Sequence, residues 1–159
     1  MKPRVNEQSR IEIKFNAHDI SLMASMLEKL SSTIDIMYFL MERQEERGFV
    51  SMLVSAKNID LKRLIEKEKR DTDIMFEISE EEKLYAIICQ DTKIDGGYHF
   101  AERLLKKILE GKGEEVYCIE FEIRSVSHKI KYIIYRLMEL YLQTKQAKIK
   151  SEIVFKTLN

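Results

Sequence analysis

The order of apolar patterns between residues 49 and 123 is the feature that most limits how this chain can fold. Near-continuous or alternating apolar runs of strand length occupy residues 49–54, 74–78, 84–89 and 117–123. Apolar residues at helical spacing lie between these runs, at 61–65 and at 100–108. The pattern predicts the order strand–helix–strand–strand–helix–strand. The link at 79–83 is short and polar, so the two middle strands are expected to form an antiparallel hairpin.

Right-handed crossovers would fold such a unit into one antiparallel-rich sheet with both helices on the same face. This is the ferredoxin-like βαββαβ topology, an α/β (α+β) architecture that many functions use. Further elements are expected outside it: a strand at 11–15, a long N-terminal helix, a helix from 130 to 141 with Ser127 as its cap, and a closing strand at 151–155. We expect residues 1–9 to be a flexible leader and residues 10–159 to form a single domain.

The N-terminal helix carries a seven-residue apolar repeat. Its members alternate between spacings of three and four and are Ile20, Met23, Leu27, Leu30, Ile34, Met37 and Met41. Asp19 is the expected cap, residues 31–33 favour a kink, and Gly48 is the expected stop. Two interpretations stay open. The helix buries this stripe on its own sheet, or helix 20–46 pairs with a second copy of the chain or with another protein.

Composition excludes several classes of function. The 159 residues hold 27 basic and 27 acidic side chains, so the chain lacks the basic excess of a general nucleic-acid binder. The polar N-terminus has no signal-peptide core, and no apolar stretch is long enough to span a bilayer. We therefore expect a cytoplasmic protein without a nucleic-acid or membrane partner. Cys89 and Cys118 are then expected to be reduced and buried.

No pattern in the sequence predicts a metal ion or another cofactor. The three histidines, His18, His99 and His128, are isolated from one another and from the cysteines, so no zinc spacing is present. The acidic run at 80–82 falls in the hairpin link, where consecutive side chains point in different directions, and a solvated turn is the expected structure. Residues 117–123 alternate apolar residues with Cys118, Glu120 and Glu122, which predicts a strand with one solvated face.

Residues 49–155 carry a family resemblance. The string LYAIICQDTKIDGGYHFAERLLKKIL at 84–109 resembles the strand, turn and helix of GGDEF domains, the diguanylate-cyclase family. Residues 90–92 stand at the family's Pro-Asp-Thr-like turn, and residues 101–104 match its Ala-Glu-Arg-Leu stretch. Leu140 and Tyr141, followed by Lys145 and residues 153–155, are similar to its closing helix and last strand. The resemblance implies a GGDEF-like fold with an additional long N-terminal helix.

The residues that the family uses for catalysis differ in this chain. The family's hairpin has two glycines, two acidic residues and a phenylalanine, and the glycines allow the nucleotide to approach the backbone. Here the link is Ser-Glu-Glu-Glu-Lys at 79–83, without glycine. The family also places a metal-binding Asp at the end of its first central strand, where this chain has Ser55 and Lys57. Since Mg²⁺ needs oxygen ligands and a lysine repels it, the resemblance implies a degenerate domain that is not an enzyme.

One binding motif of the family is retained. Its members carry Arg-x-x-Asp upstream of the hairpin, and this motif binds the product, cyclic di-GMP. Arg70 and Asp73 stand at that position. A guanidinium can bind a phosphate or the guanine edge, and a carboxylate can accept from guanine N–H groups. A local Arg–Asp pair at a solvated helix end is the alternative.

These observations leave three hypotheses for function. The first is an inactive GGDEF-like signalling module that binds cyclic di-GMP through Arg70 and Asp73. The second is a structural or adaptor protein that acts through helix-mediated dimerisation or other protein contacts and binds no nucleotide. The third is an active nucleotidyl cyclase with relocated metal ligands, which requires carboxylates that the sequence does not place together.

Overall fold

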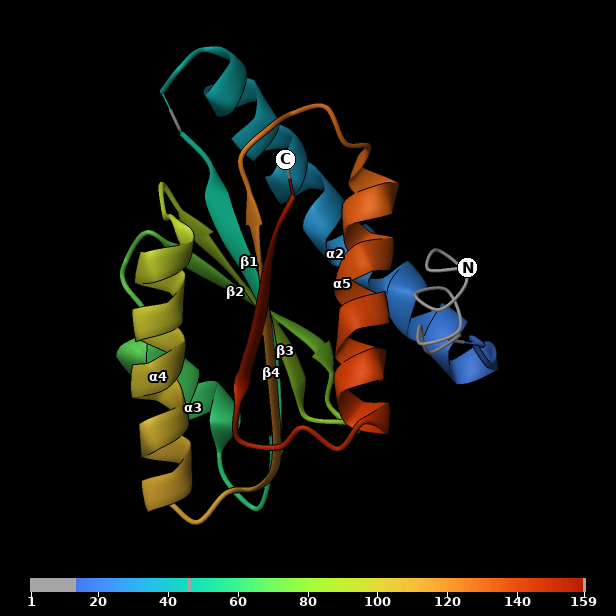
Figure 1. The fold of residues 1–159 in the computed structure, drawn as a ribbon, viewed down its shortest axis with the longest axis vertical. Coiled ribbons are helices and arrows are strands. Elements are labelled where there is room, and N and C mark those ends of the chain that lie inside the picture. The colour runs from blue at the N-terminus through green and yellow to red at the C-terminus, as the bar shows by residue number, and fades with distance from the viewer. Residues whose placement is uncertain (1–13, 46, 159) are drawn as a thin grey trace, which may run out of the picture.

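The computed structural model describes residues 14–45 and 47–158, and within them a five-stranded mixed sheet lies between two layers of helices (Figure 1). The strands are β1 Phe49–Lys57, β2 Asp73–Ser79, β3 Leu84–Gln90, β4 Glu114–Ile123 and β5 Ile153–Leu158. The helices are α2 Ala17–Glu42, α3 Leu61–Glu68, α4 Ile94–Glu110 and α5 Ile130–Gln146. The strand order is β2-β3-β1-β4-β5, in which only the β4–β5 pair is parallel.

The six elements from β1 to β4 confirm the ferredoxin-like unit. The pair β2 and β3 forms the expected antiparallel hairpin, and β1 lies between β3 and β4. Helices α3 and α4 cover one face of the sheet, and their apolar residues pack in one core with the side chains of β1, β3 and β4 that point to that face. Helices α2 and α5 cover the opposite face and form a second core there. Both faces of the central strands are therefore buried, which explains their near-continuous apolar sequence.

Helix α2 is unbroken and buries a different stripe from the one predicted. Its buried side chains are Leu22, Met26, Leu30, Ile34, Met37 and Tyr38, whereas Ile20 is 53% exposed. The seven-residue spacing was right for the second half of the helix and wrong for its first turns. The helix packs against α5 and β2, so it buries this stripe within its own domain. Ser31 lies within the unbroken helix, and its hydroxyl donates to the carbonyl of Leu27 one turn earlier.

Both ends of α2 differ from the sequence prediction. Asn16, not Asp19, is the N-cap: its side chain accepts from the backbone N–H of Asp19, and the Asp19 carboxylate accepts from that of Asn16. The helix ends at Glu42, because Gln44 turns into the left-handed region with φ 62°. Gly48 has another role. A Cβ on it would lie 2.7 Å from the carbonyl oxygen of Ile123, so glycine lets the chain pass close to β4.

The predicted solvated face of β4 was wrong. Glu120 and Glu122 are 0% and 4% exposed, since α4 covers the face of the sheet to which they point. Glu122 has partners: its Oε2 accepts from the backbone N–H of Ile94 at 2.9 Å, and its Oε1 accepts from the Thr157 hydroxyl at 2.9 Å. Neither carboxyl oxygen of Glu120 has a hydrogen-bond partner among the described residues. A buried carboxyl group without partners is costly to ionise.

The remaining predictions concern the ends of the chain. Helix α5 begins after Lys129, and Ser127 lies outside it, with its backbone N–H bonded to Ser125 instead. The closing strand is present as β5. The predicted leader at 1–9 and most of the predicted strand at 11–15 lie outside the described residues. Phe15 precedes α2 in an irregular segment and packs edge-on against Tyr135.

Two further expectations are met. Cys89 and Cys118 are free thiols and are buried, as predicted. Within residues 14–45 and 47–158, no helix combines the length and the apolar character needed to cross a bilayer.

Candidate functional site

The end of β1, where the family resemblance implies a metal-binding carboxylate, carries a neutral hydrogen-bonded pair. The hydroxyl oxygens of Ser55 and Tyr141 lie 2.7 Å apart, and both side chains are buried. Burial raises the pKa of Tyr141 above its usual range, so the pair stays uncharged. Tyr141 comes from α5 and fills the space next to the strand end. This position therefore offers hydroxyl groups rather than anionic metal ligands.

Lys57, two residues further on, is engaged at the surface. Its Nζ lies 2.7 Å from Oε2 of Glu115 at the start of β4. The hydrogen bond with Glu115 raises the pKa of Lys57, and the same bond lowers the pKa of Glu115. Both side chains are well exposed, so the pair is screened by solvent and contributes little to stability.

The hairpin between β2 and β3 is tied to both helices of the α2–α5 layer. Glu80 and Glu81 are exposed, in agreement with the predicted solvated turn. Glu82 is only partly exposed and lies between two side chains: its Oε2 lies 3.2 Å from Nε2 of His18 on α2, and its Oε1 lies 3.7 Å from Nζ of Lys145 on α5. Among the described residues, no three His, Cys, Asp or Glu side chains converge closely enough to hold a metal ion.

Arg70 and Asp73 do come together. Arg70 follows α3, and Asp73 is the first residue of β2, with its side chain 2% exposed. One guanidinium nitrogen of Arg70 lies 2.7 Å from Oδ1 of Asp73, and the backbone N–H of Arg70 donates to Oδ2 at 2.8 Å. The hydrogen bond with Asp73 raises the pKa of Arg70 above its usual range. The carboxylate is thus used to fix both the backbone and the side chain of Arg70.

The guanidinium of Arg70 also reaches the start of α4. It donates to the hydroxyl of Thr92 at 2.7 Å and to the carbonyl of Gln90 at 3.1 Å. These contacts hold a half-exposed cation in one orientation. An arginine that is already positioned loses less conformational entropy when it binds an anion.

A cavity of about 230 Å³ opens beside this arginine and is called the Arg70 pocket below. It is lined by Arg70, Asp73, Cys89, Thr92, Gly96, Phe100 and Arg103. Arg103 reaches it from α4, with its guanidinium 5.4 Å from the centre of the Phe100 ring and 3.4 Å from Oε1 of Glu68. Burial raises the pKa of Cys89, so its thiol is an inert part of the wall.

The sequence did not indicate two residues of this pocket. Thr92 and Arg103 lie in the strings that carry the family resemblance, but no pattern in the sequence marks either as a ligand contact. Arg103 is 30 or more positions from Arg70, and only the packing of α3 beside α4 brings them to one cavity. The sequence does contain one signal: Arg103 is the only Lys or Arg in the first three turns of α4, and Lys106 and Lys107 follow near its end.

No protein-family model matches the sequence, and no curated protein matches it. Solved structures share its fold. The active GGEEF domain of a diguanylate cyclase from Vibrio cholerae matches with a TM-score of 0.59 over 78% of this chain and 92% of that chain, at 14% identity. The diguanylate cyclase SiaD from Pseudomonas aeruginosa, solved in complex with its activator SiaC, matches with a TM-score of 0.53 over 98% of this chain and 75% of that chain, at 10% identity.

These similarities define the class of fold. The chain has the α/β fold of GGDEF diguanylate cyclase domains, with the long helix α2 preceding the βαββαβ core. The GGDEF-like fold that the sequence resemblance implied is therefore confirmed. At such low identities the likeness is one of fold alone.

Proposed function

We propose that this protein is a catalytically inactive GGDEF-like signalling module that binds cyclic di-GMP at the Arg70 pocket. The observation that carries the proposal is the Arg70 guanidinium, which the buried Asp73 and Thr92 hold at the edge of a cavity shared with Arg103. Cyclic di-GMP offers two phosphodiesters and two guanine edges. Guanidinium groups bind both kinds of acceptor through paired hydrogen bonds.

The geometry supports different roles for the two motif residues. Arg70 and Arg103 are the ligand contacts, and Asp73 is a positioning residue whose oxygens are used by Arg70. The pocket of about 230 Å³ is smaller than the roughly 300–1,000 Å³ of sites that enclose a drug-sized ligand. It therefore accepts one base or one phosphate, while the rest of the dinucleotide lies on the surface.

Three features support the absence of catalysis. Ser55 and Tyr141 hydrogen-bond to each other at the end of β1, Lys57 lies nearby, and the hairpin link contains Glu and Lys rather than glycines. A nucleotide triphosphate and its two Mg²⁺ ions need anionic oxygen ligands and close backbone access. The end of β1 offers hydroxyl groups instead of carboxylates, the glutamates of the hairpin link do not converge with other described ligands, and the link has no glycine.

Isothermal titration with cyclic di-GMP tests the ligand. The wild-type chain is expected to bind, and Arg70→Ala is expected to weaken binding by roughly 10- to 100-fold, because a charge-assisted pair of hydrogen bonds is lost. Arg63→Ala is the matched control: Arg63 is an exposed arginine of α3 that does not line the pocket, and its loss is expected to leave the affinity unchanged.

Two results would remove the ligand from the proposal: no heat at tens of micromolar cyclic di-GMP, or equal binding by wild type and Arg70→Ala. The catalytic part is tested separately, by incubating the chain with GTP and Mg²⁺ or Mn²⁺. Formation of cyclic di-GMP there would show an active cyclase and leave the binding result standing.

A homodimer formed through α2 is the second candidate function, in which the chain acts as an adaptor. Ile36 and Phe39 are each 57% exposed and lie one turn apart on the outer side of the helix. Sedimentation of the wild-type chain is expected to give a dimer, and Phe39→Glu a monomer, because a buried unpaired charge disrupts an apolar interface. Leu109→Glu, at an exposed apolar residue of α4, is the control. A wild-type chain that stays monomeric contradicts this candidate.

A further inference from the structure

The two edge strands of the sheet, β2 and β5, differ in their hydrogen-bond partners. At the β2 edge, α2 donates to the backbone: the Ser25 hydroxyl bonds the carbonyl of Ile78 at 3.4 Å, and the Lys29 ammonium bonds the carbonyl of Glu77. The opposite edge is β5, which pairs only with β4. Among residues 14–45 and 47–158, no group bonds the outer side of β5. An uncovered edge strand presents a row of N–H and C=O groups to which another strand can pair.

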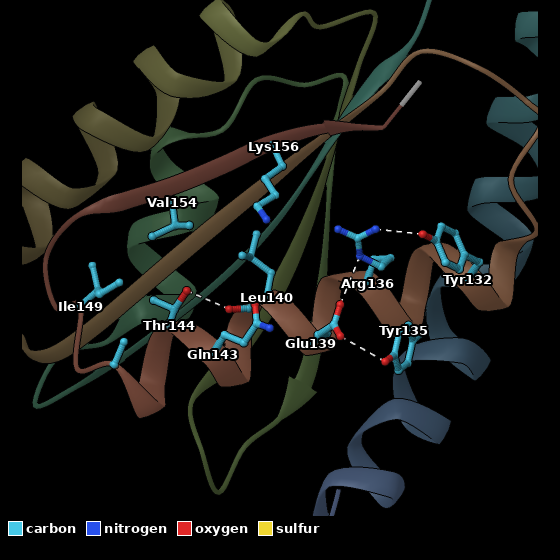
Figure 2. A pocket seen from close by; sticks show the side chains of 11 residues that line it. Tyr132, Tyr135, Arg136, Glu139, Leu140, Gln143, Thr144, Ile149, Val154 and Lys156 are labelled. Atoms are coloured by element: carbon cyan, nitrogen blue, oxygen red, sulfur yellow. Dashed lines mark hydrogen bonds and ion pairs between the residues drawn. The ribbon is translucent and has the colours of Figure 1, made fainter. Parts of the chain in front are cut away.

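A hollow lies on each side of this edge. Val154 and Lys156 point to the α5 side, where they line a cavity of about 710 Å³ together with residues of α5 such as Tyr132, Arg136 and Gln143 (Figure 2). Phe155 points to the α4 side and lines a cavity of about 320 Å³ with Ile94 and Tyr98. In Figure 1, β5 runs in front between α4 and α5. A strand added beside β5 would direct alternate side chains into the two hollows.

The two hollows differ in chemistry. On the α4 side, Phe155 is 50% exposed and Tyr98 packs edge-on against it with ring centres 5.5 Å apart, so this side favours apolar or aromatic groups. Asp95 lines the same hollow and disfavours acidic ones. On the α5 side, Lys156 forms no ion pair within the described residues, whereas Glu139 forms an ion pair with Arg136 and accepts a hydrogen bond from the Tyr135 hydroxyl.

Two further lysines lie in the segment that leads into β5. Lys148 and Lys150 lie in the segment between α5 and β5, and neither forms an ion pair within the part of the chain that the structure describes. One exposed acid, Glu152, stands among them. With Asp95 included, three lysines and two acids near this edge form no ion pair within the described residues, so the unpaired charge is net positive and lies on the α5 side at Lys156. Its complement is an extended segment with acidic side chains on one face.

We propose that β5 is a docking edge for an extended acidic peptide of a partner protein, which adds a sixth strand to the sheet. Main-chain hydrogen bonds to β5 hold the peptide in register. Its acidic side chains face Lys156 in the hollow beside α5, and the alternate apolar side chains pack on Phe155 and Tyr98 beside α4. Strand addition of this kind derives affinity from the backbone and specificity from the alternating pockets.

Fluorescence anisotropy with a designed probe tests the proposal on the full chain. The probe is a fluorescein-labelled peptide, Glu-Phe-Glu-Val-Glu-Phe-Glu, kept dilute enough to be monomeric. It is expected to bind, and the same peptide with alternate backbone nitrogens methylated is expected to bind at least about tenfold more weakly, since the pairing hydrogen bonds are lost. Lys156→Glu is expected to weaken binding about tenfold through like-charge repulsion. Lys62→Glu, the same change on the exposed surface of α3, is expected to have no effect.

Several outcomes overturn the proposal. Equal binding of the methylated and unmethylated peptides rules out strand pairing. Equal binding of a peptide with Lys in place of Glu rules out the charge match. A chain that binds no peptide and is a dimer until Lys156→Glu dissociates it assigns the edge to a second copy. Because Lys156 is exposed, its substitution leaves the fold intact, which circular dichroism of each variant checks.

Discussion

Glu120→Gln is expected to stabilise the fold, by an amount that grows with pH. Burial raises the pKa of Glu120 from 4.5 to about 8, and no described group donates to its carboxyl oxygens. At neutral pH the folded protein therefore holds a protonated Glu120, whereas the unfolded chain releases this proton. Keeping the proton bound costs about 1.4 kcal/mol for each pH unit above the unfolded pKa, or roughly 3 kcal/mol at pH 7. Glutamine has nearly the same shape and no proton to lose.

The sign of the effect follows from proton binding. Between pH 4.5 and about 8 the folded state binds more protons than the unfolded state, so wild-type stability falls as pH rises through this window and levels off above it. Urea denaturation at pH 5, 7 and 8.5 measures this. The two proteins should differ little at pH 5, and the variant should gain about 3 kcal/mol at pH 7.

Glu122→Gln is the matched control, since it is the same substitution two residues along the same face of β4. The carboxylate of Glu122 accepts from Ile94 and Thr157, so its replacement is expected to destabilise by roughly 1–2 kcal/mol rather than stabilise. If the Glu120→Gln variant gained the same free energy of unfolding at every pH, that result would contradict a protonated Glu120 in the folded protein.

Ile34→Ala is expected to lower the free energy of unfolding by roughly 2–5 kcal/mol. Ile34 lies on α2, and its side chain is fully buried against the rest of the core, so its truncation leaves a cavity. A domain of this size is usually stable by only about 5–15 kcal/mol, which makes this loss a large fraction of the total. Chemical denaturation followed by circular dichroism measures it.

Ile36→Ala provides the comparison, because the same side chain is removed two residues away on the exposed side of the helix. Its effect is expected to stay within about 0.5 kcal/mol. If Ile34→Ala and Ile36→Ala lowered the free energy of unfolding equally, the outer side of α2 would be covered in solution. That result would favour the α2 dimer over a monomer.

Local patterns in the sequence were sufficient for most of the fold. The runs at 74–78 and 84–89 with a short polar link gave the hairpin, and the face of α4 from Phe100 to Ile108 is buried as predicted. Asp60 caps α3 because its side chain accepts from the backbone N–H of Arg63. Each of these features depends on residues close together in the chain, where propensity and spacing act directly.

The predictions that were wrong, or that were missing, concern contacts between elements far apart in the sequence. Glu120 alternates with apolar residues like any half-solvated strand, and only the position of α4 over that face buries it. On α2, apolar residues cover more than one side, so the sequence could not fix which stripe would meet α5. In the candidate site, Arg70 and Asp73 were found because they are three residues apart, whereas Arg103 joins them only through helix packing.

The burial of both thiols has a practical consequence for spectroscopy. Cys89 and Cys118 are the only cysteines of the sequence, and burial raises the pKa of each, so neither is available as a reactive thiolate. A single cysteine engineered at an exposed site would then be the one position that maleimide dyes or spin labels modify in the native protein. Site-specific labelling would need no prior removal of native cysteines, and a pair of engineered cysteines would allow distance measurements.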